Sequence, residues 1–246
     1  MTLPPLRLNP SLKPEDYIEA YTRDRFVQIP DIFEPELAHA LATMLRTQIP
    51  WRLVYQTPQD GVVQISPEDA QSLGREVIAQ RMQLVMQLAE KNYGFCYNSY
   101  QMIEAVIQGR DPGHPIHEVT QFLNSRAFLD FGSAIIGEAG ITKADAQATL
   151  FGRGGFLTRH VDEGANRERR AAYTLGFSQN WQTDWGGLLM LIDKQTTDVS
   201  SAYIPRFNTL TLFDGMAVHS VSPVSAFAGD GRYSIVGWLR NDPVPT

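Results

Sequence analysis

The sequence predicts a mainly β fold with additional α-helices, in which a jelly roll is braced by helices from the N-terminal half. Two observations lead to this prediction. After about residue 145 the chain has a series of short segments of strand composition, separated by turn clusters rich in glycine, a pattern typical of jelly rolls and barrels. Before that point apolar residues mostly recur at helical spacing. We expect a single domain over residues 1–246, with 1–144 as mostly helical support that includes the first strands and 145–242 as the jelly-roll core.

The N-terminal half is predicted to combine helices with a few strands. Pro35 is well placed in the first turn of a helix, where its missing N–H costs no hydrogen bond. The cluster from Pro58 to Gly61 separates two strand-like segments, which predicts a hairpin. We expect helices at 14–23, 35–45, 67–91, 118–123 and 125–136, strands at 26–29, 51–56, 62–65 and 95–101, and a loop at 108–117.

The C-terminal half contains the strands of the predicted jelly roll. Gly186 and Gly187 stand directly before one of them, where paired glycines indicate either a close backbone approach or a tight turn. We expect the strands at 146–151, 156–160, 171–178, 188–192, 200–204, 209–213, 218–224 and 233–239.

Composition and charge narrow the class of protein. With 43% hydrophobic and 20% charged residues, the chain resembles an ordinary globular protein. A formal net charge of −6 argues against a surface that binds nucleic acid through a strong positive field. The first residues lack the pattern of a secretory signal, and no apolar stretch reaches the length of a membrane span. We expect a cytoplasmic protein without nucleic-acid or membrane partners, in which the lone Cys96 is a small buried hydrophobe.

The strongest functional signal is a His-Val-Asp triplet followed at a distance by a single histidine. His160 and Asp162 are two positions apart, so on one strand their side chains would project to the same face. His219 lies in a later predicted strand. Two imidazoles and one carboxylate on one face of a metal leave positions open for further ligands, as in non-haem Fe(II) oxygenases. We expect these three residues to bind a metal; the alternative is two structural histidines and a surface acid.

A second signal lies in the last predicted strand. Arg232 and Ser234 occupy alternate positions, so both would face the interior while Tyr233 faces outward. A guanidinium offers two parallel donors to a carboxylate, and a hydroxyl adds a third. A buried arginine needs an anionic partner, and the only acid that we place inside is on the metal. A bound dicarboxylate would supply that partner; the alternative is a structural ion pair.

These residues belong to an ordered series of motifs between Phe151 and Arg240. This block resembles the catalytic core of the 2-oxoglutarate and Fe(II)-dependent dioxygenases, in their prolyl 4-hydroxylase-like branch. The matching motifs are His-x-Asp at 160–162, Arg-Arg-x-x-Tyr-x-Leu-x-Phe at 169–177, Trp-Gly-Gly-x-Leu at 185–189, Pro-Arg-Phe-Asn-x-Leu-x-Leu-Phe at 205–213, His-x-Val-x-Pro-Val at 219–224 and Gly-Arg-Tyr-Ser-Ile-x-Gly-Trp at 231–238.

The resemblance implies a cupin-like double-stranded β-helix that forms one 2-oxoglutarate and Fe(II) oxygenase domain. It implies that His160, Asp162 and His219 hold Fe(II). It further implies that 2-oxoglutarate chelates the metal while Arg232, aided by Ser234, binds the far carboxylate of this co-substrate. His160, Asp162, His219 and Arg232 would be the catalytic residues. O₂ would be the second co-substrate, and we expect ascorbate to support turnover.

Two departures from the family pattern concern the co-substrate. Relatives often carry tyrosine in a Tyr-x-x-Gly motif before the first histidine, where this chain has Phe151. Relatives also often read Leu-Tyr-Leu-Asn where this chain reads Leu-Gly-Phe-Ser at 175–178. Either tyrosine can donate a hydrogen bond to the co-substrate in relatives. We therefore expect other polar groups, such as Gln147 or Thr149, to contribute here.

The reaction that we expect is hydroxylation of an unactivated C–H bond with release of succinate and CO₂. The branch suggests a prolyl residue of a peptide or protein as the substrate, but related barrels oxidise small molecules, and fold analogy does not choose between them. Two other classes of function stay open: a cupin-like metal-dependent isomerase or hydrolase, and a non-enzymatic sensor or binding barrel. The sequence does not indicate an oligomeric state.

Several other residues are expected to have no part in the site. We expect His39, in a predicted helix, to be an exposed or capping residue. His114 and His117 lie in a Pro/Gly loop and are expected to be solvated, the alternative being that this loop reaches the site. The charged turn at 163–170 follows the metal pair and is expected to be solvated, the alternative being closure over a substrate. The tryptophans that we expect to pack in the core or at the barrel mouth are Trp181, Trp185 and Trp238.

Overall fold

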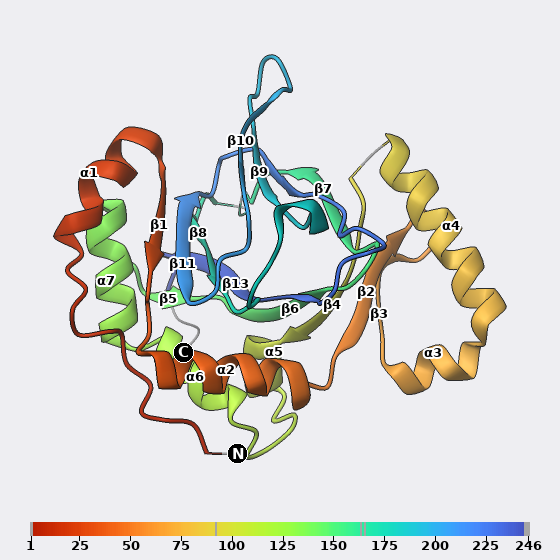
Figure 1. The fold of residues 1–246 in the computed structure, drawn as a ribbon, viewed down its shortest axis with the longest axis horizontal. Coiled ribbons are helices and arrows are strands. Elements are labelled where there is room, and N and C mark those ends of the chain that lie inside the picture. The colour runs from red at the N-terminus through yellow and green to blue at the C-terminus, as the bar shows by residue number, and fades with distance from the viewer. Residues whose placement is uncertain (1, 92, 163, 165, 244–246) are drawn as a thin grey trace.

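A computed structural model describes residues 2–91, 93–162, 164 and 166–243 (Figure 1). The helices are α1 (Glu15–Asp24), α2 (Pro35–Thr47), α3 (Pro67–Leu73), α4 (Arg75–Lys91), α5 (Met102–Ile107), α6 (Ile116–Leu123) and α7 (Arg126–Ile136). The strands are β1 (Phe26–Pro30), β2 (Arg52–Thr57), β3 (Gly61–Ile65), β4 (Phe95–Gln101), β5 (Lys143–Ala144), β6 (Gln147–Phe151), β7 (Phe156–His160), β8 (Arg169–Gly176), β9 (Leu189–Ile192), β10 (Val199–Tyr203), β11 (Thr209–Asp214), β12 (His219–Val221) and β13 (Arg232–Arg240).

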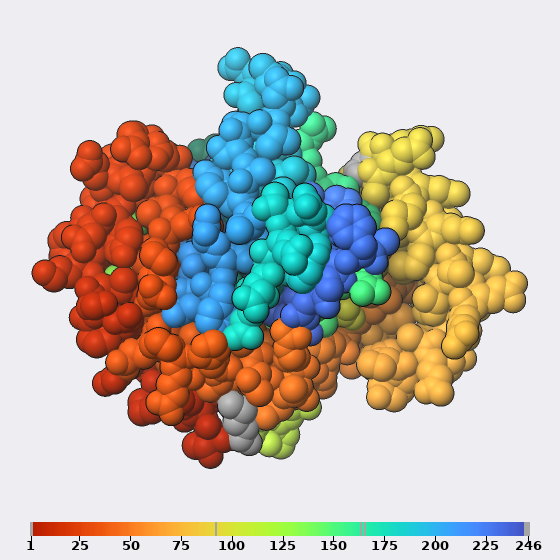
Figure 2. Space-filling view, in the orientation of Figure 1, coloured from red at the N-terminus to blue at the C-terminus, as the bar shows by residue number. Residues whose placement is uncertain are grey.

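The strands form one antiparallel sheet that curls into a half-barrel, which confirms the predicted jelly-roll-like fold. The main path runs β1-β11-β8-β13-β6-β4-β7-β12-β9-β10, the β2–β3 hairpin pairs with β4, and β5 pairs with β13. Helices α1 and α7 lie against one side of the sheet, α2, α5 and α6 lie beneath it, and α3 and α4 flank the opposite end (Figure 1). The turn between β9 and β10 is exposed and projects from the body (Figure 2).

The structure corrects several predicted elements. The helix predicted at 67–91 is two helices, because Gly74 adopts φ +82°, outside the helical region. The predicted loop at 108–117 is shorter, since α6 begins at Ile116, and α5 and β5 were not predicted. Of the strand predicted at 218–224, only β12 forms in the structure. Within the described residues, no helix combines the length and the apolar character needed to cross a bilayer.

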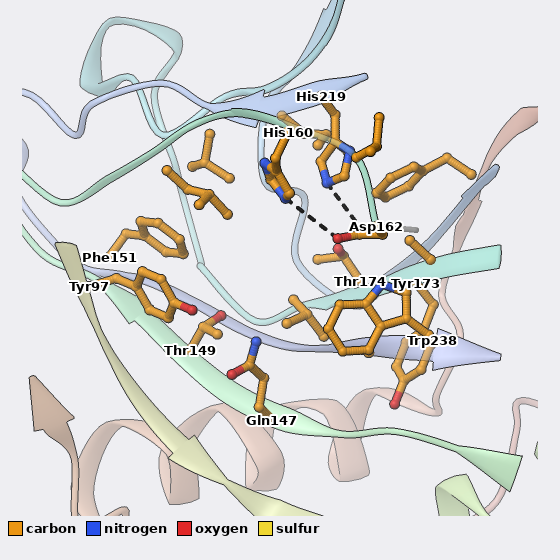
Figure 3. A pocket seen from close by; sticks show the side chains of 18 of the residues that line it. Tyr97, Gln147, Thr149, Phe151, His160, Asp162, Tyr173, Thr174, His219 and Trp238 are labelled. Carbon is orange, nitrogen blue, oxygen red and sulfur yellow. Dashed lines mark ion pairs between the residues drawn. The ribbon is translucent and has the colours of Figure 1, made fainter. Parts of the chain in front are cut away.

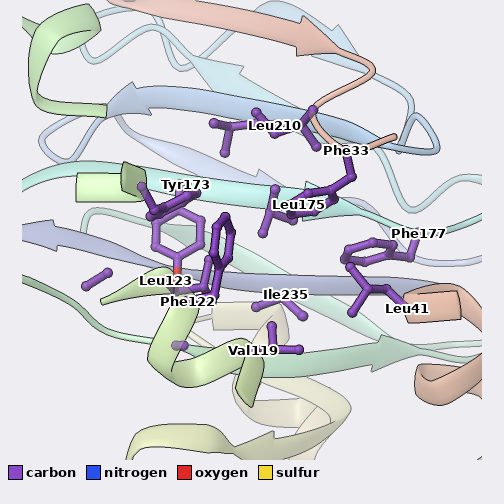
Figure 4. Packing of buried hydrophobic residues seen from close by; sticks show 14 of the residues in the cluster. Phe33, Leu41, Val119, Phe122, Leu123, Tyr173, Leu175, Phe177, Leu210 and Ile235 are labelled. Carbon is purple, nitrogen blue, oxygen red and sulfur yellow. The ribbon is translucent and has the colours of Figure 1, made fainter. Parts of the chain in front are cut away.

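The main hydrophobic core lies between the helices and the outer surface of the sheet (Figure 4). On β13 the apolar residues alternate with residues that face the other way, because side chains on a strand alternate between its two faces. Ile235 and Leu239 are fully buried in this core, together with Leu175 of β8. Helices contribute Leu41 from α2 and Phe122 from α6. The packed outer face therefore fixes the positions of β8 and β13, whose inner faces form the site described next.

Candidate metal centre and co-substrate pocket

His160, Asp162 and His219 meet at the ends of two neighbouring strands. His160 is the last residue of β7 and His219 the first of β12, and the two are paired across the strands. Asp162 lies just beyond the end of β7, where its backbone N–H donates to the carbonyl of Gly215 at 3.1 Å. The prediction that both members of the triplet lie on one strand is therefore only half right. The β7 strand supplies His160, and the contact with Gly215 holds the chain beyond it in place for Asp162.

The side chains of the three residues converge on one point (Figure 3). Nε2 of His160 lies 3.5 Å from Oδ1 of Asp162, and Nε2 of His219 lies 3.4 Å from Oδ2 of the same carboxylate. The potential ligand atoms all lie within 4.8 Å of one another. Two imidazole nitrogens and a carboxylate oxygen are the donor set of the facial Fe(II) site. The residues present therefore fit the metal that the motif predicts.

Backbone carbonyls orient both imidazoles. Nδ1 of His160 lies 2.9 Å from the carbonyl oxygen of Thr158, and Nδ1 of His219 lies 3.0 Å from that of Ala217. An N–H at Nδ1 that donates to a carbonyl leaves the lone pair of Nε2 free for a metal, which is how metal-binding histidines are usually held. Each ring is thus held in the tautomer and orientation that metal binding needs.

Electrostatics favour the protonation states of a metal-binding site. Burial, aided by the charge of His160, lowers the pKa of His219, so its imidazole is neutral near pH 7. Burial opposes the ionisation of Asp162, but a hydrogen bond with His160 and the charges of both histidines outweigh it and lower the pKa of the carboxyl. The indole of Trp238 also favours the ionised carboxylate.

The triad lies on one wall of a cavity of about 540 Å³ inside the half-barrel. Tyr97, Gln147 and Thr149 lie on the opposite wall, on β4 and β6 (Figure 3). Apolar side chains cover much of the remaining surface: Phe151, Leu157, Leu189, Phe213, Val221 and Val236. Such a lining, with a few polar groups in fixed positions, is typical of small-molecule sites.

Arg232 lines the same cavity from β13 and carries a buried positive charge. Its side chain is 4% exposed, and burial lowers the pKa of the guanidinium to about 10. The guanidinium faces the ring of Phe151 at 5.2 Å, yet its Nε has no hydrogen-bond partner among the described residues. The fully buried Oγ of Ser234 has none either, although Ser234 does not itself line the cavity. Unpartnered buried donors of this kind cost stability unless a ligand uses them.

The paired glycines lie close to neighbouring segments, Gly186 to Pro223 and Gly187 to Arg232. Gly186 and Gly187 both have positive φ, +69° and +62°. A Cβ on Gly186 would lie 2.1 Å from the carbonyl oxygen of Pro223, and one on Gly187 would lie 3.1 Å from Cδ of Arg232. Both interpretations of the pair, tight turn and close approach, are therefore correct.

The structure also explains one departure from the family pattern. Gly176 ends β8, and a Cβ there would lie 2.1 Å from the carbonyl oxygen of Arg206, so no larger residue fits this backbone path. At the other departure, Phe151 presents only an apolar ring to the cavity. A residue that sequence reasoning missed stands beside it: the ring of Tyr97 stacks on Phe151 with centroids 4.8 Å apart. The sequence did contain a signal for it: Tyr97 and Ser99 are two positions apart on the predicted strand at 95–101, which places both side chains on one face.

Three further residues line the cavity, although the sequence did not predict a place for them there. Arg169 stacks on the indole of Trp238 at 3.7 Å, and both line the cavity, so Trp238 is more than mouth packing. Tyr93 lies at the rim, with its ring 5.6 Å from that of His160. Glu163, in the charged turn after the triplet, lies outside the described residues.

The remaining histidines do not line the cavity; His39 is exposed, as predicted, whereas His114 and His117 are half-buried rather than solvated. The exposed His39 contacts Gln179, and ring nitrogens of His114 and His117 face backbone carbonyls away from the cavity. Trp181 and Trp185 pack edge to face. Cys96 is half-buried on β4, and burial raises the pKa of its thiol to about 11, which suits the predicted inert hydrophobe.

Comparison with known proteins supports the predicted class of this site. Residues 146–240 match the family model of the 2OG-Fe(II) oxygenase superfamily. The matched region covers the predicted catalytic core, which is similar to that of this superfamily. This similarity supports the 2-oxoglutarate-dependent dioxygenase that the motifs predicted, with Fe(II), 2-oxoglutarate and O₂ as the groups that the family implies. No curated protein sequence matches the chain.

Solved structures of this superfamily share the fold over nearly the whole chain. A Pseudomonas putida prolyl-4-hydroxylase has 20% identity and a TM-score of 0.57, covering 94% of this chain and 100% of its own. A 2OG-Fe(II) oxygenase family protein from Burkholderia pseudomallei has 13% identity and a TM-score of 0.59, covering 96% and 94%. A Trichoplax adhaerens prolyl hydroxylase, solved with a hypoxia inducible factor peptide fragment, has 17% identity and a TM-score of 0.57, covering 93% and 89%. The helices before residue 145 thus belong to the shared architecture.

Proposed function

We propose that this 2OG-Fe(II) oxygenase hydroxylates an unactivated C–H bond, with His160, Asp162 and His219 as the iron ligands. Arg232, aided by Ser234, binds the far carboxylate of 2-oxoglutarate. One observation carries the proposal: a buried guanidinium without an anionic partner among the described residues opens into the same cavity as the metal-binding triad. A dianionic co-substrate supplies the partner that this charge needs.

The residues of the chain divide the work between them. When bound, Fe(II) and 2-oxoglutarate supply the oxidation chemistry, in which O₂ is consumed, the co-substrate is converted to succinate and CO₂, and the substrate gains a hydroxyl group. His160, Asp162 and His219 keep one face of the metal occupied and leave the other open toward the cavity. Arg232 orients the co-substrate, and the apolar lining excludes water from the reacting groups.

The substrate that we favour is a prolyl residue of a peptide. Support comes from structural neighbours described as prolyl hydroxylases, one of them solved with a peptide fragment. The cavity also reaches the surface: Tyr93 and Val161 line it and are 43% and 39% exposed. An open rim of this kind gives a side chain on a larger partner access to the metal. A free amino acid or another small molecule is the second candidate.

The central test measures succinate formation by purified protein with Fe(II), 2-oxoglutarate, ascorbate and O₂. We expect slow succinate release alone and faster release with proline-containing peptides, which should gain the mass of one oxygen atom. The His219→Ala and Arg232→Ala variants should lose this activity. Absence of succinate under all these conditions would count against a hydroxylase.

The same assay separates the rival classes. A metal-dependent isomerase or hydrolase needs no co-substrate, so its 2-oxoglutarate binding would be unchanged in Arg232→Ala. A sensor barrel would bind metal and 2-oxoglutarate without turnover. We further propose that residues 1–246 form one oxygenase domain with the catalytic core at 145–242 and that the protein acts in the cytoplasm.

A further inference from the structure

The cavity wall opposite the metal-binding residues carries a hydroxyl group beside the place where the family tyrosine is missing. Tyr97 and Phe151 lie on neighbouring strands, and their rings are nearly parallel, with 20° between the planes and 4.8 Å between the centroids. Phe151 in turn faces the guanidinium of Arg232. Tyr97 therefore brings a phenol hydroxyl from β4 to the region that a tyrosine at position 151 would serve from β6.

Gln147 lies beside this hydroxyl, and its side chain has a fixed orientation. Its Oε1 accepts hydrogen bonds from Nε2 of Gln101 at 2.8 Å and from Oγ of Ser99 at 3.2 Å. Nε2 of Gln101 also donates to Oγ of Ser99 at 3.0 Å. Because the amide oxygen is taken by these two donors, the amide N–H₂ group of Gln147 points the other way, into the cavity (Figure 3).

Both groups are present as donors. Burial raises the pKa of the Tyr97 hydroxyl to about 12, against a smaller opposite effect of the contact with Gln147, so the phenol stays protonated at neutral pH. The hydroxyl of Thr149, a residue 2% exposed, lies on the same wall. A three-residue network that directs one buried amide N–H₂ group into the cavity is costly unless a ligand with acceptor oxygens binds there.

We propose that Tyr97 and Gln147 form a donor pair that hydrogen-bonds oxygen atoms of bound 2-oxoglutarate, in place of the hydroxyl that Phe151 lacks. This inference rests on the proposed function, since it concerns the co-substrate of the same site. The pair supplements Arg232: the guanidinium neutralises a carboxylate, and the two neutral donors add hydrogen bonds from the facing wall. Ser99 and Gln101 act only through Gln147 and are positioning residues.

The test measures binding of 2-oxoglutarate by calorimetry to protein loaded with Mn(II), without O₂ and without turnover. Tyr97→Phe and Gln147→Leu each remove one donor, and each should weaken binding about 10-fold, the value of one hydrogen bond to a charged acceptor. Tyr100→Phe is the matched control. It removes a hydroxyl from the same strand, but that hydroxyl donates to Asp111, and Tyr100 does not line the cavity, so binding should not change.

A rescue variant and metal binding complete the design. Phe151→Tyr in the Tyr97→Phe background restores a hydroxyl from the neighbouring strand and should recover most of the affinity. Affinity for Mn(II) alone should equal that of the wild type in both single variants, which a collapsed pocket would not allow. Unchanged 2-oxoglutarate affinity in both Tyr97→Phe and Gln147→Leu overturns the donor pair. Failure of the wild-type protein to bind 2-oxoglutarate overturns the proposed function instead.

Discussion

The two faces of β13 show how one strand serves both stability and function. On the outer face, Ile235 (Figure 4) and Leu239 are fully buried in a core of apolar partners. On the inner face, Arg232 and Ser234 are as deeply buried, yet a polar atom of each has no partner among the described residues. The outer face stabilises the fold, and the inner face reduces that stability until a ligand binds. Alternation of side chains along one strand is enough to separate the two roles.

The inner surface of the whole half-barrel carries two kinds of polar residue. Around the metal-binding residues, the imidazoles contact backbone carbonyls and the Asp162 carboxylate is flanked by both histidines, so the groups are oriented before any ligand arrives. Around Arg232, by contrast, Nε of Arg232 and Oγ of Ser234 have no hydrogen-bond partner among the described residues. This difference suggests that metal binding needs little rearrangement, whereas 2-oxoglutarate completes the hydrogen bonding of its own pocket.

The largest effect is expected from the metal-binding residues. His219→Ala removes one of two imidazoles and should lower succinate formation about 1,000-fold or more, because the metal supplies the oxidation chemistry. Its fold should persist, since the lost ring lies on the cavity side. His114→Ala, outside the cavity, serves as the control and should keep full activity. Iron content after dialysis and the rate of succinate release are the measurements.

The outer face should show the next largest effect, on stability rather than on chemistry. Ile235→Ala removes a fully buried side chain and should lower the free energy of unfolding by about 2–5 kcal/mol. Activity per folded molecule should stay close to that of the wild type at low temperature. Denaturant unfolding combined with the succinate assay measures both. A loss of 2-oxoglutarate affinity in the folded variant would show that the two faces are not independent.

Arg232→Met should separate the two roles within one residue. A methionine of similar length removes an unpartnered buried charge, so the ligand-free protein should gain about 1 kcal/mol of stability, or about 2–4 °C in Tm. The same change should weaken 2-oxoglutarate binding about 100-fold, because charge-assisted hydrogen bonds are lost. Scanning calorimetry with and without 2-oxoglutarate gives both values. A lower Tm in the ligand-free variant would mean that Arg232 has a structural partner.

The smallest effect is expected at the surface end of β13. Nη2 of Arg46 on α2 lies 2.6 Å from Oδ2 of Asp230, and its hydrogen bond lowers the pKa of this carboxyl. Asp230→Asn should cost about 0.5 kcal/mol, since the pair is partly exposed. Because the folded-state pKa lies below the unfolded one, this contribution is full above the unfolded value near pH 4 and disappears as the pH falls through the folded value. Thermal unfolding of both proteins between pH 7 and pH 2 checks the sign.

Local sequence patterns predicted the strands well because turn clusters and apolar alternation mark them directly. They did less well where backbone conformation decides, as at Gly74, which divides a continuous helical pattern into α3 and α4. The convergence of the three candidate metal ligands was predictable because their residue types and spacing are specific. Trp238 and Arg169 were not, because their places in the cavity depend on how β8 and β13 pair, including a register shift near Arg240.

The sequence by itself predicted the jelly-roll-like fold, the residues that fit a metal and the arginine that needs an anion, since each depends on residue type and on local periodicity. Only the tertiary structure decided what stands in for the missing tyrosine. Tyr97 reaches the cavity through pairing between β4 and β6, strands 45 residues apart at their closest ends, and no local pattern records such pairing. Local strand geometry fixes the direction of a side chain, but the curling of the sheet decides which walls of the half-barrel face each other. That curling places β4 and β6 opposite the candidate metal ligands.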